Sequence, residues 1–255
     1  MFNANTLIQN RYRLMMRKND NSYTETWCAL DLLTNMEVTI IIIKNHSEFY
    51  AEEFRMEKIP YILHHPNIVQ IYSVDVFDSH IYLVLPYYSQ SADQYIGCID
   101  ETKLWHFILD VSSGLAYLHS HYIIHRNIRP DTIFEDANGK FVISGYWENW
   151  FYHSTQFSHE MNTSYFGPEM FMSKTQITKA TDIWALGATL YEIAIGELPF
   201  FGQGGFMLLK GTPMLEIKGN YSTNLKNIIK KCLAKDPWDR PTAEQLMGYV
   251  KAIID

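Results

Sequence analysis

The sequence predicts an α+β fold in two lobes, and three observations lead to this prediction. The chain has 255 residues, of which 47% are hydrophobic and 15% are aromatic, so it can bury a large core. Strand patterns lie within residues 12–85, interrupted by one helix pattern, and only helix patterns follow from residue 103. No low-complexity tract, repeat or Pro/Gly-rich linker is present. Segregation of strands and helices along one chain indicates the α+β class.

The smaller lobe is expected to cover about residues 8–88. Residues 12–43 have the pattern of three strands separated by turns, and the third strand, VTIIII, is rich in β-branched residues. A polar helical stretch at about 47–63 follows, and then two apolar strands at 68–76 and 80–85. The prediction for this lobe is therefore a five-stranded antiparallel sheet with one helix.

The larger lobe is expected to cover about residues 89–255 and to be helical. In the segment 103–119 the apolar residues recur at helical spacing: Leu104, Phe107, Ile108, Val111, Leu115 and Leu118. Further amphipathic helices are predicted at 181–195, 225–233 and 242–253. The two lobes together are predicted to form one domain, 1–255.

Charge and cysteine content exclude several classes of function. The formal net charge is −7 and there is no long basic run, which argues against a nucleic-acid partner. The longest apolar run has only the length of a strand and no signal peptide is visible, so neither a membrane partner nor secretion is expected. Cys28, Cys98 and Cys232 form no CxxC pair, which favours a reducing compartment, expected to be the cytoplasm, and predicts no metal site.

Six short motifs occur in a fixed order along the chain. They are HPNIV at 65–69, GLAYLHSHYIIHR at 114–126, GPE at 167–169, DIWALG at 182–187, GELPF at 196–200 and DPWDRP at 236–241. In this order they resemble the landmarks of a protein kinase domain, of the serine/threonine type, over essentially the whole chain. The resemblance implies a bilobal protein kinase-like fold.

The resemblance implies structural roles for five residues. Glu169 and Arg240 match a buried ion pair that ties the activation segment to the last helices. Asp182 matches a buried carboxylate that accepts backbone hydrogen bonds from the catalytic loop, and His125 helps to maintain the shape of that loop. Arg126 matches an arginine that either receives an activation-segment phosphate or donates to loop carbonyls.

The residues that carry phosphoryl transfer in kinases are replaced in this sequence. The proton acceptor becomes Asn127, which cannot take a proton at any useful pH. The two magnesium ligands become Thr132 and Gly145, so both direct protein ligands to the metal are lost. The resemblance therefore implies no catalytic residue and no metal site.

The nucleotide cleft is also predicted to be degraded. The lysine of the third strand falls at Ile41, seven residues after Thr34, and Lys44 could replace it only if a bulge reset the register. Its carboxylate partner would be Glu53 or Glu57. Asn19, Asn21 and Thr24 stand at the three glycine positions of the phosphate loop, and Thr39, Leu85 and Phe134 line the adenine pocket. No cofactor is expected, and ATP binding without magnesium is the alternative left open.

The start of the activation segment, residues 146–152, is unusually aromatic. These rings either pack inside and fill the empty cleft, or Trp150, Phe151 and Tyr152 are exposed anchors for a partner. The favoured function is a pseudokinase, similar to the STE20-related kinase adaptors, that acts as a scaffold or allosteric regulator. Its partner is expected to be a protein, with a kinase and a second copy of this chain as candidates. The alternative is an atypical nucleotide-dependent enzyme that uses Lys44 and carboxylates such as Asp131.

Overall fold

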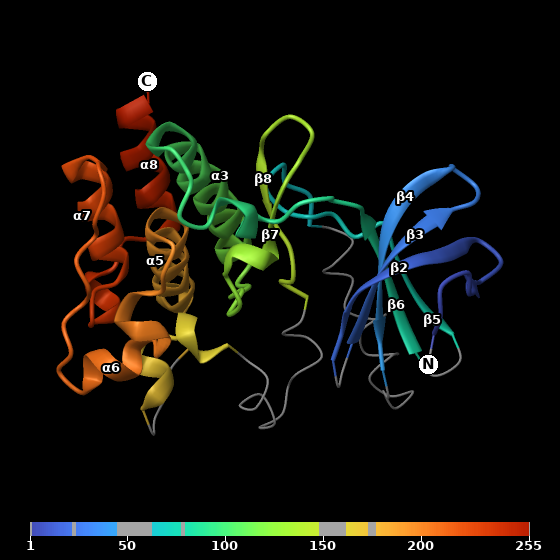
Figure 1. Ribbon diagram of the computed structural model, residues 1–255, viewed down its shortest axis with the longest axis horizontal. Coiled ribbons are helices and arrows are strands. Elements are labelled where there is room, and N and C mark those ends of the chain that lie inside the picture. The colour runs from blue at the N-terminus through green and yellow to red at the C-terminus, as the bar shows by residue number, and fades with distance from the viewer. Residues whose placement is uncertain are drawn as a thin grey trace. The chain divides into compact units, whose positions relative to one another are not determined.

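The computed structural model describes residues 2–21, 24–44, 63–77, 80–147, 162–172 and 177–254. The chain divides into two compact units (Figure 1). The first unit comprises Met1–His65 and Val69–Ser89, and the second comprises Pro66–Ile68 and Gln90–Asp255. Each unit is described by itself below.

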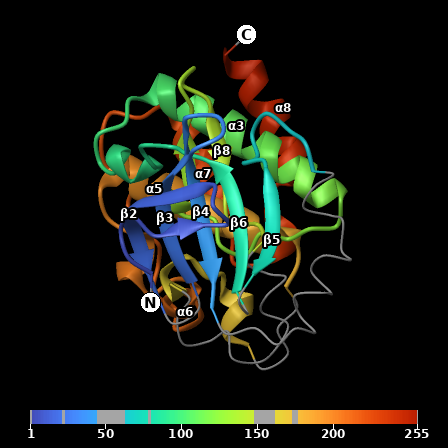
Figure 2. The same ribbon diagram turned by 90° about the vertical axis from the view of Figure 1, so that its right-hand side faces the viewer.

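The first unit contains a six-stranded antiparallel sheet with the order β1-β2-β3-β4-β6-β5. Figure 2 shows the longer strands side by side in this order. The strands are β1 (Leu7–Ile8), β2 (Tyr12–Asp20), β3 (Thr24–Asp31), β4 (Met36–Ile43), β5 (Ser73–Phe77) and β6 (His80–Pro86). The predicted helix at 47–63 lies, except for Leu63, outside the described residues.

Two features of this sheet differ from the prediction. The two-residue strand β1 adds a sixth strand at the edge of β2. The strand expected at 68–76 begins only at Ser73, because Asn67 and Ile68 belong to the second unit and pair within it. There, Asn67 accepts a hydrogen bond of 2.9 Å from the amide of Ile143, and Ile68 forms an isolated parallel bridge with the same residue.

Alternation along β4 defines the two faces of the sheet. Val38, Ile40 and Ile42 belong to a buried cluster on one face, here called the outer face, with side chains from β2, β3 and β6. Thr39 and Ile41 point to the opposite face because successive side chains alternate. The register of β4 is continuous up to Ile43 against both neighbours, from Met36 against β3 and from Val38 against β6.

The second unit is mainly helical. Its α-helices are α3 (Glu101–Ser120), α5 (Lys179–Ile195), α6 (Gly205–Leu209), α7 (Thr223–Cys232) and α8 (Ala243–Ile254). A hairpin of β7 (Ile133–Glu135) and β8 (Phe141–Ile143) accompanies them. The 3-10 turns are η1 (Ala92–Tyr95), η2 (Pro130–Thr132), η3 (Thr163–Tyr165), η4 (Pro168–Phe171), η5 (Pro199–Gly202) and η6 (Pro237–Asp239).

Local signals set the helix ends. The Asp100 side chain caps α3 by accepting from the Lys103 amide at 2.8 Å, and the Ser222 hydroxyl caps α7. Helix α5 ends at Gly196, whose φ of 86° lies in the left-handed region that favours glycine.

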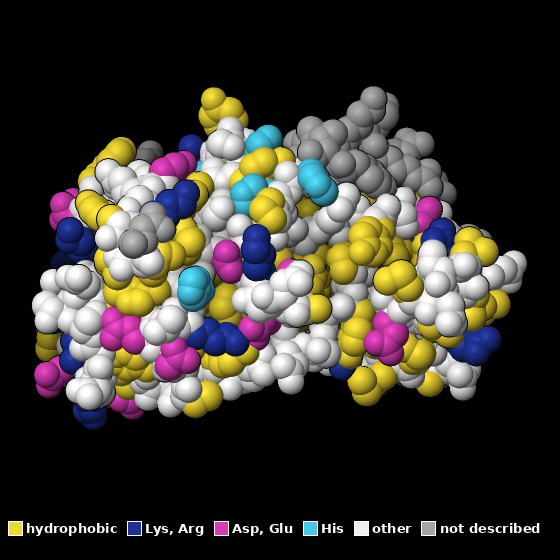
Figure 3. All heavy atoms as spheres, turned by 90° about the horizontal axis from the view of Figure 1, so that it is seen from above, with side chains coloured by type: hydrophobic (Ala, Val, Ile, Leu, Met, Phe, Trp, Pro, Cys, Tyr) yellow, Lys and Arg dark blue, Asp and Glu magenta, His cyan; other side chains and the backbone are white. Residues whose placement is uncertain are grey.

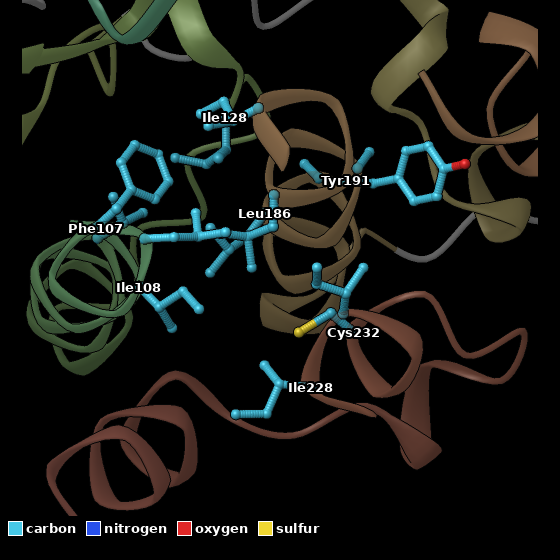
Figure 4. Close-up of a cluster of buried hydrophobic side chains, with 14 of the residues drawn as sticks. Phe107, Ile108, Ile128, Leu186, Tyr191, Ile228 and Cys232 are labelled. Carbon is cyan, nitrogen blue, oxygen red and sulfur yellow. The ribbon is translucent and has the colours of Figure 1, made fainter. Parts of the chain in front are cut away.

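Helix α5 lies at the centre of the core of this unit. Thirteen of its residues are buried, and Trp184 stacks on Phe200 with 5.7 Å between the ring centroids. Figure 4 shows Leu186 of α5 near Phe107 and Ile108 of α3, whereas the ring of Tyr191 extends from the other side of α5. The three cysteines are free: Cys28 and Cys232 are buried and Cys98 is exposed.

Acidic and basic side chains are interspersed on the face shown in Figure 3, so neither sign of charge dominates that face. Among the described residues, no helix has the length and apolar character needed to cross a membrane. The same part of the chain contains no group of three or more His, Cys, Asp or Glu side chains placed to hold a metal ion.

Candidate functional site

The loop that begins at His125 is held in shape by one buried carboxylate. The amides of His125 and Arg126 donate to the two oxygens of Asp182 at 2.8 and 2.7 Å. His119 Nε2 lies 2.8 Å from the same carboxylate, which is fully buried on α5. Two backbone amides that donate to one carboxylate fix the start of the loop. The backbone of Arg126 adopts a φ of 65° at this point.

The ring of His125 joins this loop to the segment before Gly145. Its Nε2 donates to the carbonyl of Ser144 at 2.8 Å, and its Nδ1 accepts from the amide of Asn127 at 3.2 Å. Burial lowers the pKa of His125, so the ring is neutral and can act as donor and acceptor at once. Its role is therefore to connect two backbone segments.

The three positions assigned to proton transfer and magnesium carry no carboxylate. Asn127 has a neutral amide, and Gly145 is buried with a φ of 89° and no side chain. The Thr132 hydroxyl donates to the carbonyls of Asn127 and Arg129 at 2.9 and 3.0 Å and accepts from the Arg129 amide at 3.2 Å. Its hydrogen-bonding capacity is thus used within the loop, and it is only 7% exposed.

Glu169 and Arg240 form a buried bidentate ion pair in the second unit. Arg240 Nη1 and Nη2 each donate to one carboxylate oxygen of Glu169 at 2.7 Å. The remaining guanidinium donors reach the carbonyls of Ala180, Ala234 and Lys235. The pair connects η4 to the turn after η6, and its hydrogen bonds satisfy a charge that water does not reach.

In the first unit, three backbone amides of the hairpin between β2 and β3 donate to oxygen atoms of the hairpin itself. The Asn21 amide donates to the carbonyl of Thr24 at 2.9 Å, and the Thr24 amide donates to Asn21 Oδ1 at 2.7 Å. The Asp20 amide donates to Asn19 Oδ1 at 2.8 Å. Three backbone donors that a phosphate loop would present to a ligand are therefore taken by the hairpin itself.

Lys44 lies just beyond β4 and is held by this hairpin. Its Nζ lies 2.5 Å from Asp20 Oδ1, 2.8 Å from the Asn21 carbonyl and 3.5 Å from Glu25 Oε1. Asp20 pairs with Glu25 across β2 and β3, and Glu25 is on the same side of β3 as Trp27, which belongs to the outer-face cluster.

Comparison with known proteins assigns the family. A family model described as a protein kinase domain matches residues 25–250. The chain belongs to the protein kinase domain family. Kinase domains of the serine/threonine type are among its relatives, which agrees with the order of motifs in the sequence.

Three relatives show how far the similarity of this kinase domain extends. Mitogen-activated protein kinase kinase kinase 3 of Arabidopsis thaliana is 32% identical over 72% of the chain and 32% of that protein. Serine/threonine-protein kinase PrkC of Bacillus subtilis is 29% identical over 97% of the chain and 41% of that protein. Mitogen-activated protein kinase kinase kinase YODA of Arabidopsis thaliana is 28% identical over 90% and 27%. The chain thus spans less than half the length of these relatives.

The described part of β4 has no bulge that would bring Lys44 to the position of the lysine in this kinase domain. The replacement required a bulge in β4, but the register stays continuous through Ile41, which pairs with Thr26 and Leu83. Ile41 therefore keeps the lysine position, and Lys44 is occupied by Asp20 and Glu25. The alternative role of Lys44 required that bulge, and it stays a prediction. Its partners Glu53 and Glu57 lie outside the described residues.

The other residues expected to line the adenine pocket, Thr39, Leu85 and Phe134, are described within their own units. In the first unit Leu85 is buried and pairs with Thr39 across β6 and β4. In the second unit Phe134 pairs with Val142 in the β7–β8 hairpin and is partly buried.

The aromatic start of the activation segment is described only at its first residues. Tyr146 and Trp147 are 0% and 2% exposed, and their rings meet edge to face with 5.0 Å between the centroids. Burial raises the pKa of the Tyr146 hydroxyl. The interpretation that these rings pack inside holds for these two residues. Trp150, Phe151 and Tyr152 lie outside the described residues, so their role as an interface stays a prediction.

Asp131, the carboxylate of the alternative function, has a partner in the loop. Arg129 Nε lies 3.0 Å from Asp131 Oδ1, and the Asp131 side chain is 42% exposed. Sequence reasoning predicted polar side chains in the phosphate loop but missed that Asn19 and Asn21 take its amides. Asn19 and Asn21 are the signal that could have indicated it, because the short side chain of Asn readily accepts from nearby backbone amides.

Proposed function

We propose that this kinase domain is catalytically inactive and acts as a scaffold or allosteric regulator of a protein partner. The observation that carries the proposal is the loop at Asn127 and Thr132. Hydrogen bonds within the loop hold its backbone, yet it has no group to accept a proton and, with Gly145, none of the expected side-chain ligands for magnesium.

The state of the phosphate loop supports the same proposal. The amides of Asp20 and Thr24 donate to the side-chain oxygens of Asn19 and Asn21, and the carboxylate of Asp20 would add negative charge beside a triphosphate. Ile41 offers no charge to the phosphates. We therefore propose little or no binding of ATP and magnesium.

The simultaneous replacement of several catalytic groups favours an inactive domain over a weakly active one. Loss of one preorganised group that stabilises charge in the transition state typically costs about 3–4 kcal/mol, or a factor of 10² to 10³ in rate. In this chain the proton acceptor, two metal ligands and the lysine are replaced together. These losses need not add, but a single restored residue leaves the others missing.

The architecture that supports the loop is retained. Asp182 still holds the loop backbone, and Glu169 still pairs with Arg240. A domain that keeps these contacts without catalytic groups is suited to present a surface to a protein partner. A kinase is the first class of partner to test, in line with the resemblance to STE20-related kinase adaptors, and a second copy of the chain is the next. The kinase names of the relatives describe those proteins.

The proposal is tested by thermal denaturation with and without millimolar ATP and magnesium, together with a radioactive phosphate-transfer assay. The expected result is no rise in melting temperature and no transfer above a buffer control. Clear stabilisation accompanied by transfer would overturn the proposal. Lys44→Met is the matched control, since a response that survived this substitution would not depend on Lys44.

A variant in which the expected catalytic residues are restored serves as the positive control. It carries Ile41→Lys, Asn127→Asp, Thr132→Asn and Gly145→Asp together. The left-handed backbone at Gly145 opposes a side chain there, so recovery is expected to be partial. The partner surface is tested separately by comparing binding of a candidate kinase to the wild type and to a Trp150, Phe151 and Tyr152 triple alanine variant.

A further inference from the structure

The turn between β7 and β8 holds the single Asn-Gly pair of the sequence, Asn138-Gly139 (Figure 1). Both residues are exposed, and no hydrogen bond joins the side-chain amide of Asn138 to another described residue. Gly139 has a φ of 79°, and a Cβ added to it would come within 4 Å only of Glu135 Oε1, at 3.6 Å. The side-chain amide of Asn138 is therefore free to rotate toward the backbone that follows it.

An asparagine placed in this way reacts with the backbone nitrogen of the next residue, because the two groups are held close together in one chain. The Gly139 nitrogen attacks Asn138 Cγ and forms a new N–Cγ bond, the Cγ–Nδ2 bond breaks, and ammonia leaves with the proton of the Gly139 amide. The product is a five-membered succinimide. Water then opens this ring, at Cγ to give aspartate or at the backbone carbonyl carbon to give isoaspartate. The net reaction consumes one water and releases one ammonia.

The residue after the asparagine decides whether the attacking nitrogen is accessible. A side chain there shields the nitrogen and restricts the backbone dihedrals, whereas glycine does neither. One bond opposes the attack in this turn, since the Gly139 amide donates to the Asp136 carbonyl at 3.0 Å. This bond lies in an exposed turn, and such bonds open locally at a small cost in free energy. The turn therefore delays the reaction without preventing it.

The hydrogen bonds of the turn depend on the length of its main chain. Asp136 Oδ1 accepts from the amides of Asn138 and Lys140, both at 2.8 Å. The Asp136 amide in turn donates to the Lys140 carbonyl at 2.8 Å. In isoaspartate the main chain runs through Cβ and Cγ, so one additional atom separates the two amides and Asp136 cannot hold both of them. The product also carries a carboxylate in place of a neutral amide, which repels Asp136.

We propose that Asn138 is a site of spontaneous deamidation and that its isoaspartate product opens the turn between β7 and β8. The co-reactant is water, so neither a partner protein nor a cofactor takes part. Opening of the turn loosens the adjoining end of β7, where Glu135 Oε1 binds Lys103 Nζ of α3 at 2.7 Å. The inference does not rest on the proposed function, because the reaction is the same in an active and in an inactive kinase domain.

The first test is incubation of the folded chain at physiological temperature, in neutral and in mildly alkaline buffer, followed by peptide mass spectrometry. The peptide that contains Asn138 is expected to gain about 1 Da, faster in the alkaline buffer because the attacking nitrogen must lose its proton. Fragmentation should show isoaspartate beside aspartate. Absence of the mass increase in the folded chain overturns the proposal, and the chain unfolded in urea then shows whether the turn protects Asn138. Aspartate without isoaspartate overturns the succinimide route.

Asn220 provides an internal control in the same unit. It is also exposed, but it is followed by Tyr221, whose hydroxyl is hydrogen-bonded to the Ile99 carbonyl at 3.0 Å. Its peptide should keep its mass while that of Asn138 changes. Equal conversion at the two asparagines would mean that exposure alone is sufficient, and this result would overturn the role of Gly139.

Two variants and the purified product complete the test. Asn138→Ser and Gly139→Ala should both abolish the mass increase, and Asn138→Ser does so without straining the left-handed backbone at Gly139. The isoaspartate form, separated by anion exchange, should show amide hydrogen exchange at Lys140 about tenfold faster than the unmodified chain. Freshly purified Asn138→Asp has the same added charge with a normal main chain and should retain protection. Unchanged exchange in the isoaspartate form would overturn the proposed opening of the turn.

Discussion

Replacement of Glu169 by alanine is expected to be among the most destabilising single changes in the second unit. The side chain of Arg240 is 0% exposed and that of Glu169 is 10% exposed, and two hydrogen bonds of 2.7 Å join them. The substitution leaves a buried guanidinium with only backbone carbonyls as acceptors. Breaking a buried ion pair at one partner costs about 3–5 kcal/mol, a large part of a total stability of about 5–15 kcal/mol.

A free-energy loss of this size is measurable as a decrease in melting temperature. For a domain of this size each kcal/mol lowers the melting temperature by about 2–4 °C, so Glu169→Ala should lower it by roughly 6–20 °C. Urea denaturation then gives the loss of unfolding free energy directly. If Glu169→Ala costs less than about 1 kcal/mol, the charge is not buried as described and the reasoning is refuted.

A double-mutant cycle separates the pair from its surroundings. Glu169→Met with Arg240→Met removes both charges, and the double variant should be far less destabilised than either single variant, because no unpaired charge stays buried. The matched control is Arg11→Ala, which breaks a bidentate pair with Asp31. Arg11 is 40% exposed, so solvent screening should keep this loss near about 1 kcal/mol.

Four further predictions concern single residues. Gly114→Ala should destabilise the chain by about 1–3 kcal/mol in urea denaturation, since the added Cβ would lie 2.6 Å from the Asn67 carbonyl oxygen. Gly248→Ala in α8 meets nothing within 4 Å and should stabilise it by about 0.5–1 kcal/mol; a loss would contradict the helix assignment. Lys44→Met should lower the free energy of unfolding by no more than about 1 kcal/mol. If ATP stabilised the wild-type chain and not this variant, Lys44 would bind the nucleotide, and the proposed absence of that role would be wrong. Burial lowers the pKa of His125 below its ordinary value of 6.5, so the unfolded chain takes the proton first and stability falls as the pH drops below about 6.5. A His125→Gln chain should show a smaller decrease in urea midpoint between pH 7 and pH 5.5, and an unchanged decrease would exclude His125 as the cause.

The sequence was sufficient for the supporting residues of the loop. The roles expected for Asp182, Glu169 and Arg240 follow from motifs in which each residue has a fixed place, and the hydrogen bonds found for them are those expected. The replacements at Asn127 and Gly145 are also visible without a structure, because the absence of a carboxylate is a property of the residue type.

The edge strands of the sheet in the first unit could not be predicted from the sequence in the same way. Residues 68–76 have the apolar pattern of one strand, yet Asn67 and Ile68 pair with β8 and the strand starts at Ser73. Strand β1 has only two residues, too short for any periodicity to be detected. Both features depend on which backbone groups find partners far along the chain.

By itself, the sequence determined the two-lobed α+β class, the kinase family and the missing catalytic groups, because periodicity, motif order and residue type are local properties. Only the tertiary structure decided to which groups the Lys44 ammonium and the described hairpin amides donate. Lys44 could have served the phosphates or the hairpin, and the choice depends on the register of β4 and on the position of Asp20 across the sheet. Such choices are set by contacts between segments that are distant in sequence, and a local pattern does not contain them.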